Sequence, residues 1–190
     1  QSLAQITDAV ATLQADLTDP SDSQDTETSG GGKSHGDGRQ IGRGSGTGEP
    51  GIPRAQRWEI YFQDAGTLES YARQLDFFKI ELGVIGGTNQ VQYAFNLAKP
   101  KPDTRVGPGS EEKRLYMTWR QGSLQQADRD LVSRAGLSAS GRLVVQFYPP
   151  DTENVLANVE RNFRGLEATK IRKTRFGVRD AGGGFEFYVI

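Results

Sequence analysis

Hydrophobic positions divide the chain into three regions. In residues 1–20, aliphatic residues recur at spacings of three and four, the period of an amphipathic helix. They are Leu3, Ile6, Val10, Leu13 and Leu17. Residues 21–56 are rich in Ser, Asp, Thr and Gly and cannot bury enough apolar surface to offset the entropy lost on folding. We therefore predict an amphipathic N-terminal helix over 1–20, a disordered linker over 21–56 and one folded domain over 57–190.

The folded region opens with a period of two over 58–62, which predicts a strand, and a helical period over 68–75 follows Gly66-Thr67. Two further alternating runs flank a turn at 86–89. Matching apolar side chains across a four-residue loop predicts a hairpin with a definite register. Its facing pairs are Val84 with Val91, Leu82 with Tyr93, Ile80 with Phe95, and Phe78 with Leu97.

The second part of the domain repeats this order. Residues 98–112 contain three prolines and predict a loop, after which the pattern predicts a strand over 115–119 and a helix over 123–135. A strand over 143–147, with Leu143, Val145 and Phe147 on its inward face, and a helix over 151–163 come next. A last hairpin turns at 180–183. Its predicted facing pairs are Val178 with Phe185, Phe176 with Phe187, and Thr174 with Val189.

Residues 57–97 and 142–190 thus share the order strand, helix, strand, turn, strand. The pattern predicts an α+β fold built from these two halves and joined by residues 113–136. We expect a mainly antiparallel sheet with about three helices on one face.

Composition and charge exclude several classes of protein. All 2 Trp, 6 Tyr and 9 Phe lie in 57–190, so this region can bury a core by itself. It carries nineteen basic and sixteen acidic residues, whereas 1–56 carries four basic and eight acidic, which gives the net charge of −1. Neither balance is basic enough to favour nucleic acid. With no cysteine, disulfides, thiolate nucleophiles and zinc–thiolate sites are excluded.

Candidate catalytic groups are few. The single histidine, His35, lies in the predicted linker, so the folded region lacks the commonest general base. We interpret three acidic pairs as solvated surface: Glu111 with Glu112, Asp128 with Asp130, and Asp64 with Glu69. We therefore expect no catalytic residue, no cofactor and no metal site.

Tyrosines and arginines occupy the strand positions that alternate with the predicted inward residues. Both residue types are enriched at binding surfaces because they combine contact area with directed hydrogen bonds. The alternation predicts one open sheet face as a partner-binding site. Its candidate residues are Tyr61, Tyr116, Tyr148, Tyr188, Arg114, Arg120, Arg175 and Arg179. A solvated face without a partner remains an alternative interpretation.

Two stretches carry a resemblance to a known group of proteins. Residues 71–85, YARQLDFFKIELGVI, and 146–150, QFYPP, resemble uncharacterised membrane-anchored proteins of planctomycete type. The order of tether and domain is similar to the extracytoplasmic domain of the ExbD/TolR biopolymer-transport family. The resemblance implies a membrane-tethered cell-envelope protein that acts by protein–protein or cell-wall contact, with any membrane attachment through a segment upstream of Gln1. A cytoplasmic protein is the alternative.

These observations favour a non-catalytic interaction module that binds a protein or envelope partner. Pairing with a second copy through the N-terminal helix or the sheet face is open. Two other function classes remain as hypotheses. One is a platform for single-stranded nucleic acid on the same face. The other is a hydrolase that uses carboxylates alone, which would require two convergent acids in a cleft.

Overall fold

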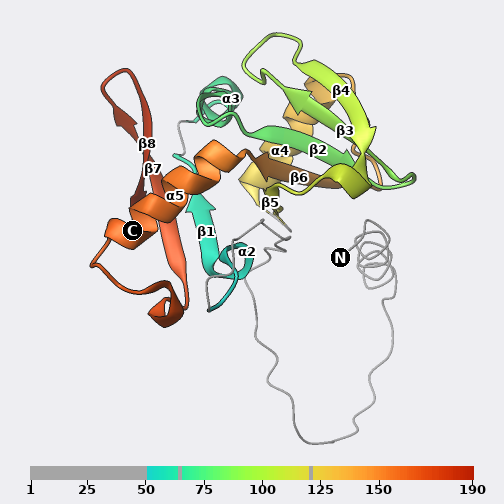
Figure 1. Cartoon of the computed structure of the whole chain (residues 1–190). Coiled ribbons are helices and arrows are strands. Elements are labelled where there is room, and N and C mark those ends of the chain that lie inside the picture. Colours follow the sequence, from blue (N-terminus) through green and yellow to red (C-terminus); the bar gives the residue numbers. More distant parts are fainter. Residues whose placement is uncertain (1–50, 64–65, 120–121) are drawn as a thin grey trace, which may run out of the picture.

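The computed structural model describes residues 51–63, 66–119 and 122–190. The predicted N-terminal helix, the predicted linker up to residue 50 and Arg120 lie outside these ranges. The described residues form two sheets (Figure 1), and the helices pack against and between them. The predicted α+β class is confirmed, but two sheets form in place of the single sheet that we expected.

The larger sheet has five antiparallel strands in the order β4-β3-β2-β6-β5. These strands are β2 (Glu81–Ile85), β3 (Gln90–Phe95), β4 (Asp103–Pro108), β5 (Leu115–Met117) and β6 (Leu143–Tyr148). The smaller sheet has the order β1-β7-β8, in which β1 runs parallel to β7 and β7 antiparallel to β8. Its strands are β1 (Trp58–Tyr61), β7 (Thr174–Ala181) and β8 (Gly184–Val189).

Four helices and two short 3-10 turns complete the described part. They are α2 (Arg54–Arg57), α3 (Leu68–Phe77), α4 (Ser123–Arg134), α5 (Pro150–Asn162), η1 (Gly109–Glu111) and η2 (Ala168–Lys170). Thr67 caps α3 by accepting a hydrogen bond from the Ser70 amide, as the Gly66-Thr67 signal predicted. Pro150 occupies the first turn of α5, where its missing N–H costs no helical bond.

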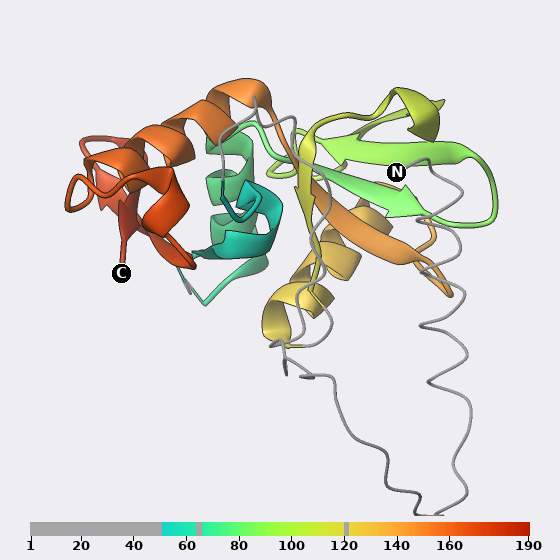
Figure 2. The same ribbon diagram turned by 60° about the horizontal axis from the view of Figure 1, so that its bottom comes forward.

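One main core continues through both sheets. It joins Trp58, Ile60 and Phe176 of the smaller sheet to Leu82 and Val144 of the larger one. Figure 1 shows α5 across the smaller sheet and α4 behind the larger one, and Figure 2 shows α2 and α3 between the two sheets. The face of the larger sheet opposite α4 holds a second small cluster, formed by Ile85, Val91, Tyr93, Val145 and Phe147.

The first strand of each half pairs with a strand of the other half, and this explains why two sheets form. The first strand of the N-terminal half, β1, pairs with β7, while the first strand of the C-terminal half, β6, pairs with β2. Each sheet therefore contains strands of both halves. A sequence pattern shows where strands lie but does not show which distant strand each one joins.

The first hairpin forms, but its predicted register is wrong by one residue. Ile85 faces Val91 and Gly83 faces Tyr93, so residues 86–90 lie between the last facing pair. Apolar matching failed because β2 is apolar on both faces: Leu82 and Val84 contact the main core, whereas Ile85 belongs to the second cluster. When both faces are buried, the alternation no longer distinguishes neighbouring registers.

The second hairpin is shifted by two residues from its predicted register. Ala181 faces Gly184, and Gly182 and Gly183 alone form the turn, both with positive φ. A two-residue turn of this type matches the twist of the strands and favours glycine. Because the shift is even, Phe176, Val178 and Phe187 still point to the predicted core side.

Two predicted irregular segments are also structured. Residues 103–108, predicted as part of a loop, form the edge strand β4, in which Pro108 is tolerated because its nitrogen points away from β3. The predicted boundary between residues 56 and 57 falls inside α2, whose Arg54 donates to Glu153 of α5 at 3.0 Å. Residues 51–56, which we assign to the linker from the sequence, therefore belong to the described part of the chain.

Candidate interaction surface along β8

The predicted Tyr/Arg residues do not form one face. Four of them, Tyr61, Arg175, Arg179 and Tyr188, lie on the side of the smaller sheet opposite α5. Arg175 donates to Glu59 at 3.1 Å and Tyr61 donates to the same carboxylate at 3.2 Å. Arg179 donates to Glu186 at 2.6 Å and lies 5.1 Å from the centre of the Tyr188 ring. Each of the two guanidinium groups is therefore paired with an acid.

Two other predicted residues lie on the larger sheet. Tyr116 packs against Phe147 in the second cluster. Arg114 lies over the Phe147 ring at 5.0 Å and binds Glu112 and Glu81 at 2.6 and 2.8 Å. This guanidinium covers an aromatic cluster of its own chain, which limits its availability to a partner.

Tyr148 is a correction to our prediction, because it is buried in the main core with 1% of its surface exposed. We assigned Leu143, Val145 and Phe147 to the inward face of β6, but Val144, Gln146 and Tyr148 face α4. Both faces of this central strand are buried, so alternation gave the wrong side. Because Tyr148 is buried and the other described candidates lie on two different sheets, they do not form the single open face that we predicted. Arg120 lies outside the described residues.

Asp128 of α4 also departs from its interpretation as a solvated acid. It accepts hydrogen bonds from the Tyr71 hydroxyl at 2.7 Å and from Gln146 Nε2 at 3.0 Å, and Gln146 in turn accepts from Tyr148 at 2.8 Å. Burial raises the pKa of Asp128 to about 7, against the lowering effect of these donors. Asp128 is 2% exposed, so its carboxyl group is closed off from solvent in this structure.

Glu160 of α5 is also buried, as are Glu59 of β1 and Glu153 of α5. Its Oε1 accepts from Arg57 Nε, Trp58 Nε1 and Thr174 Oγ1 at 3.0, 2.8 and 2.5 Å, and its Oε2 accepts from Arg57 Nη2 at 2.5 Å. Burial by itself would raise the pKa of Glu160, but these donors outweigh it and hold the pKa below its ordinary value. The carboxylate anchors α5 to α2, β1 and β7 and is poorly suited to act as a base.

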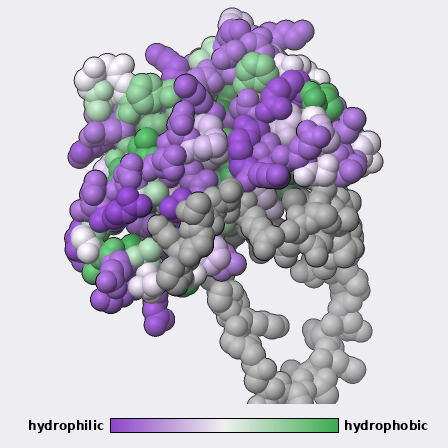
Figure 3. All heavy atoms as spheres, viewed as in Figure 1, coloured by the Kyte–Doolittle hydropathy of each residue, from purple (hydrophilic) through white to green (hydrophobic). Residues whose placement is uncertain are grey.

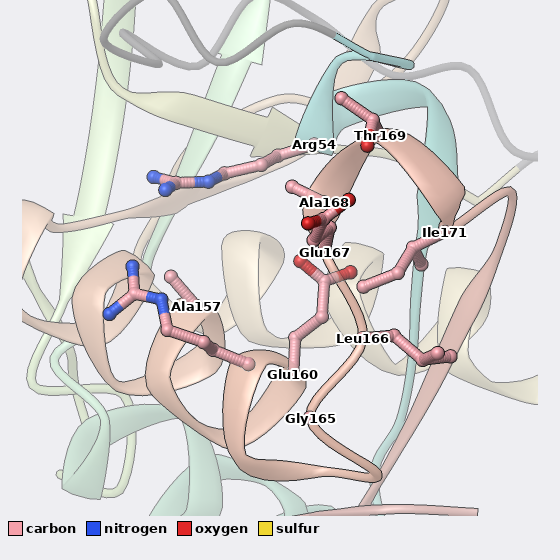
Figure 4. Close-up of a pocket in the computed structure, with 10 residues that line it drawn as sticks. Arg54, Ala157, Glu160, Gly165, Leu166, Glu167, Ala168, Thr169 and Ile171 are labelled. Atoms are coloured by element: carbon pink, nitrogen blue, oxygen red, sulfur yellow. The ribbon is translucent and has the colours of Figure 1, made fainter.

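A hollow of about 500 Å³ lies beside the end of α5. In Figure 4, Glu160 is directed into it between Arg54 and the side chains of Leu166 and Ile171. The other acid that lines it, Glu167, lies 3.4 Å from exposed Lys170. With Glu160 engaged by four donor contacts, this hollow offers no pair of free acids of the kind that glycoside hydrolysis requires.

The four sheet edges differ in how they are protected against pairing. The edge strand β5 has three residues and β1 has four. The longer β4 carries Asp103, Arg105 and Pro108. In contrast, β8 has six residues, GFEFYV, of which only Glu186 is charged. Short length, charge and proline are the usual protections of an edge, and β8 has only the single charge.

The backbone of β8 presents a regular set of free groups. Because the Ile190 amide donates to the Arg175 carbonyl, the even-numbered residues of this strand are hydrogen-bonded to β7. The N–H and C=O groups of Phe185, Phe187 and Val189 consequently point away from β7, and among the described strands none pairs with them. Their side chains face α5 and the main core.

Exposed apolar side chains surround this edge. Five of them, which we call the apolar band, are between 41% and 63% exposed. The band consists of Phe77, Val155, Phe163, Leu166 and Ile190. Phe77 and Val155 line a hollow of about 420 Å³ with Phe185 and Phe187, and the other three line one of about 390 Å³ with Val189. Figure 3 shows hydrophobic residues among hydrophilic ones on the side of the molecule that carries α5 and the β7–β8 hairpin.

Sequence reasoning placed Phe185, Phe187 and Val189 on the inward face but did not identify their strand as an edge. The available signal was the near absence of charge in GFEFYV. A signal also existed for Asp128, which lies four residues after Leu124 and three before Leu131, on the apolar side of its helix.

Comparison with protein-family models, with curated proteins and with solved structures finds no match to this chain. The resemblance to ExbD/TolR-like envelope proteins therefore stays a prediction. Within residues 51–63, 66–119 and 122–190, no helix is long and apolar enough to cross a membrane. The same ranges contain no group of three or more His, Cys, Asp or Glu side chains placed to hold a metal ion.

Proposed function

We propose that this protein is a non-catalytic interaction module that binds an extended segment of a protein partner as an additional strand along β8. The observation that carries the proposal is the free edge of β8, where Phe185, Phe187 and Val189 direct their backbone groups outward. In strand addition the main-chain hydrogen bonds supply affinity, and pockets for alternate side chains supply specificity. The two hollows beside β8 are suited to that second role.

The chemistry of the edge specifies the partner strand. Its side chains on the α5 side should be apolar, because they would contact Phe185, Phe187 and the apolar band. On the opposite side an acidic residue facing Glu186 would be disfavoured, since like charges on facing residues repel. The setting proposed for this contact is the cell envelope, in line with the resemblance noted above.

The arrangement of charged groups supports an interaction module over the two alternatives. Arg175 and Arg179 are each bonded to an acid, so a phosphate backbone would have to compete with Glu59 and Glu186. The buried acids Asp128 and Glu160 lie among donors of their own chain. A hydrolase that used either of these two acids would need it to reach a substrate.

Peptide selection with the full chain tests the proposal. Peptides from a random displayed library should be enriched for extended apolar sequences. At low protein concentration, bound peptides should slow hydrogen exchange at the backbone amides of Phe185, Phe187 and Val189. The substitution Val189→Pro removes one outward N–H without removing a bond to β7, so it should weaken peptide binding at least tenfold while the chain stays folded.

Val106→Pro on β4 is the matched control, because position 106 alternates with Pro108 on the other long edge and also directs its N–H outward. This variant should bind the selected peptides as the parent chain does. Peptides that bind the Val189→Pro variant with unchanged affinity, or that protect amides elsewhere only, would refute strand addition at β8.

A further inference from the structure

We propose, on the premise of strand addition at β8, that the partner strand is β8 of a second copy of this chain. Two chains related by a two-fold axis would then form one continuous six-stranded sheet with the order β1-β7-β8-β8-β7-β1. An interface of this kind is self-complementary, because each chain supplies the same strand and the same surface. The geometry of the edge determines which residues would face each other.

In a two-fold pair of antiparallel strands, one residue at the centre faces its own copy. Three such registers bring the outward backbone groups of the two strands together, and their central residues are Glu186, Phe187 and Tyr188. The first places Glu186 directly opposite its own copy, which is unfavourable because like charges would face each other. The third brings together only Phe187 and Val189. The register centred on Phe187 aligns all three outward residues: Phe187 faces itself, and Phe185 faces Val189 of the other copy, so the largest number of hydrogen bonds can form.

Side-chain chemistry agrees with this central register. On the α5 side every facing pair is apolar or aromatic, the type of pair that stabilises antiparallel strands. On the other side Glu186 faces Tyr188, and Arg179 of the same chain already neutralises Glu186 at 2.6 Å. Phe77 and Phe163, which are 51% and 41% exposed beside the edge, would be partly covered.

The oligomeric state of the full chain is the first test. Sedimentation equilibrium should give twice the mass of one chain, and Val189→Pro should give the mass of a single chain with an unchanged circular dichroism spectrum. The control Val106→Pro should remain a dimer. A dimer that survives Val189→Pro would overturn the inference.

Disulfide trapping tests the register without interference from native thiols, because the chain contains no cysteine. In the central register residues 186 and 188 of opposite copies form a closely spaced pair, with Cα atoms about 4.5 Å apart, which is within reach of a disulfide. A mixture of the Glu186→Cys and Tyr188→Cys variants, oxidised with diamide, should yield mainly the mixed dimer. Each variant oxidised alone should yield little covalent dimer, and the opposite result would overturn the register.

The outcomes separate this inference from the proposed function. A monomeric chain that binds selected peptides along β8 would refute the second copy as partner and leave the interaction module standing. A monomeric chain that shows no amide protection at Phe185, Phe187 and Val189 with any selected peptide would refute both. In the dimer these amides should be protected without peptide and should lose protection on dilution.

Discussion

The two sheets each hold a buried carboxylate, but they stabilise it in different ways. Glu160, beside the smaller sheet, is paired with Arg57 and two neutral donors. Asp128, beside the larger sheet, has only neutral donors, Tyr71 and Gln146. The cation lowers the pKa of Glu160, whereas burial raises the pKa of Asp128 to about 7. A buried acid therefore favours the folded state at high pH when it has a cation and at low pH when it has none.

The largest effect is expected from Glu160→Gln. This change leaves the guanidinium of Arg57, which is 3% exposed, without its counter-charge. Breaking one side of a buried ion pair typically costs about 3–5 kcal/mol, so the free energy of unfolding in urea should fall by that amount. Glu167→Gln, at an exposed acid, should change it by less than about 0.5 kcal/mol. A loss of under about 1 kcal/mol for Glu160→Gln would contradict the anchoring role.

Asp128 should make stability depend on pH in the opposite sense to Glu160. Its folded pKa of about 7 lies above its ordinary value of 3.8, so the folded state binds the proton more tightly. Its contribution is fully present below about pH 4 and is lost as the pH rises to 7, by about 3 kcal/mol in the free energy of unfolding. Urea unfolding at several pH values should show this slope in the parent chain and lose it in Asp128→Asn.

Asp130→Asn provides the matched control on the same helix, since Asp130 is exposed and accepts from Gln126. It should keep the slope between pH 4 and 7. If Asp128→Asn and the parent chain show parallel pH profiles, the buried acid does not titrate in this range.

A smaller contrast is expected between two glycines, one in each sheet. A Cβ at Gly83 would lie 2.3 Å from the Phe147 ring, which is 1% exposed and covered by Arg114. A Cβ at Gly177 would lie 2.5 Å from the Tyr188 ring, which is partly exposed and can turn into solvent. Gly83→Ala should therefore cost about 2 kcal/mol and Gly177→Ala less than about 1, as measured by urea unfolding. Equal costs would show that the two rings are equally constrained.

The sequence predicted the type and order of most elements, because helix and strand periods are local properties of the chain. It did not predict sheet membership, since the pairing of β1 with β7 joins residues 116 positions apart, such as Trp58 and Thr174. Strand faces were predicted correctly where one side is polar, as in β7, and incorrectly in β6, where both sides are buried. The candidate surface was missed for the same reason, because a strand becomes an edge only through its long-range neighbours.

The exchange of strands between the two halves has a consequence for biosynthesis. During translation β1 emerges before its partner β7, which follows more than a hundred residues later. Similarly, β2 acquires its neighbour β6 only after α4 has been made. The larger sheet can therefore not be completed before β6 has been made, nor the smaller sheet before β8, and contacts between residues so distant in sequence slow folding because long loops must close first. The nascent polypeptide should accordingly remain sensitive to protease until the β7–β8 hairpin leaves the exit tunnel.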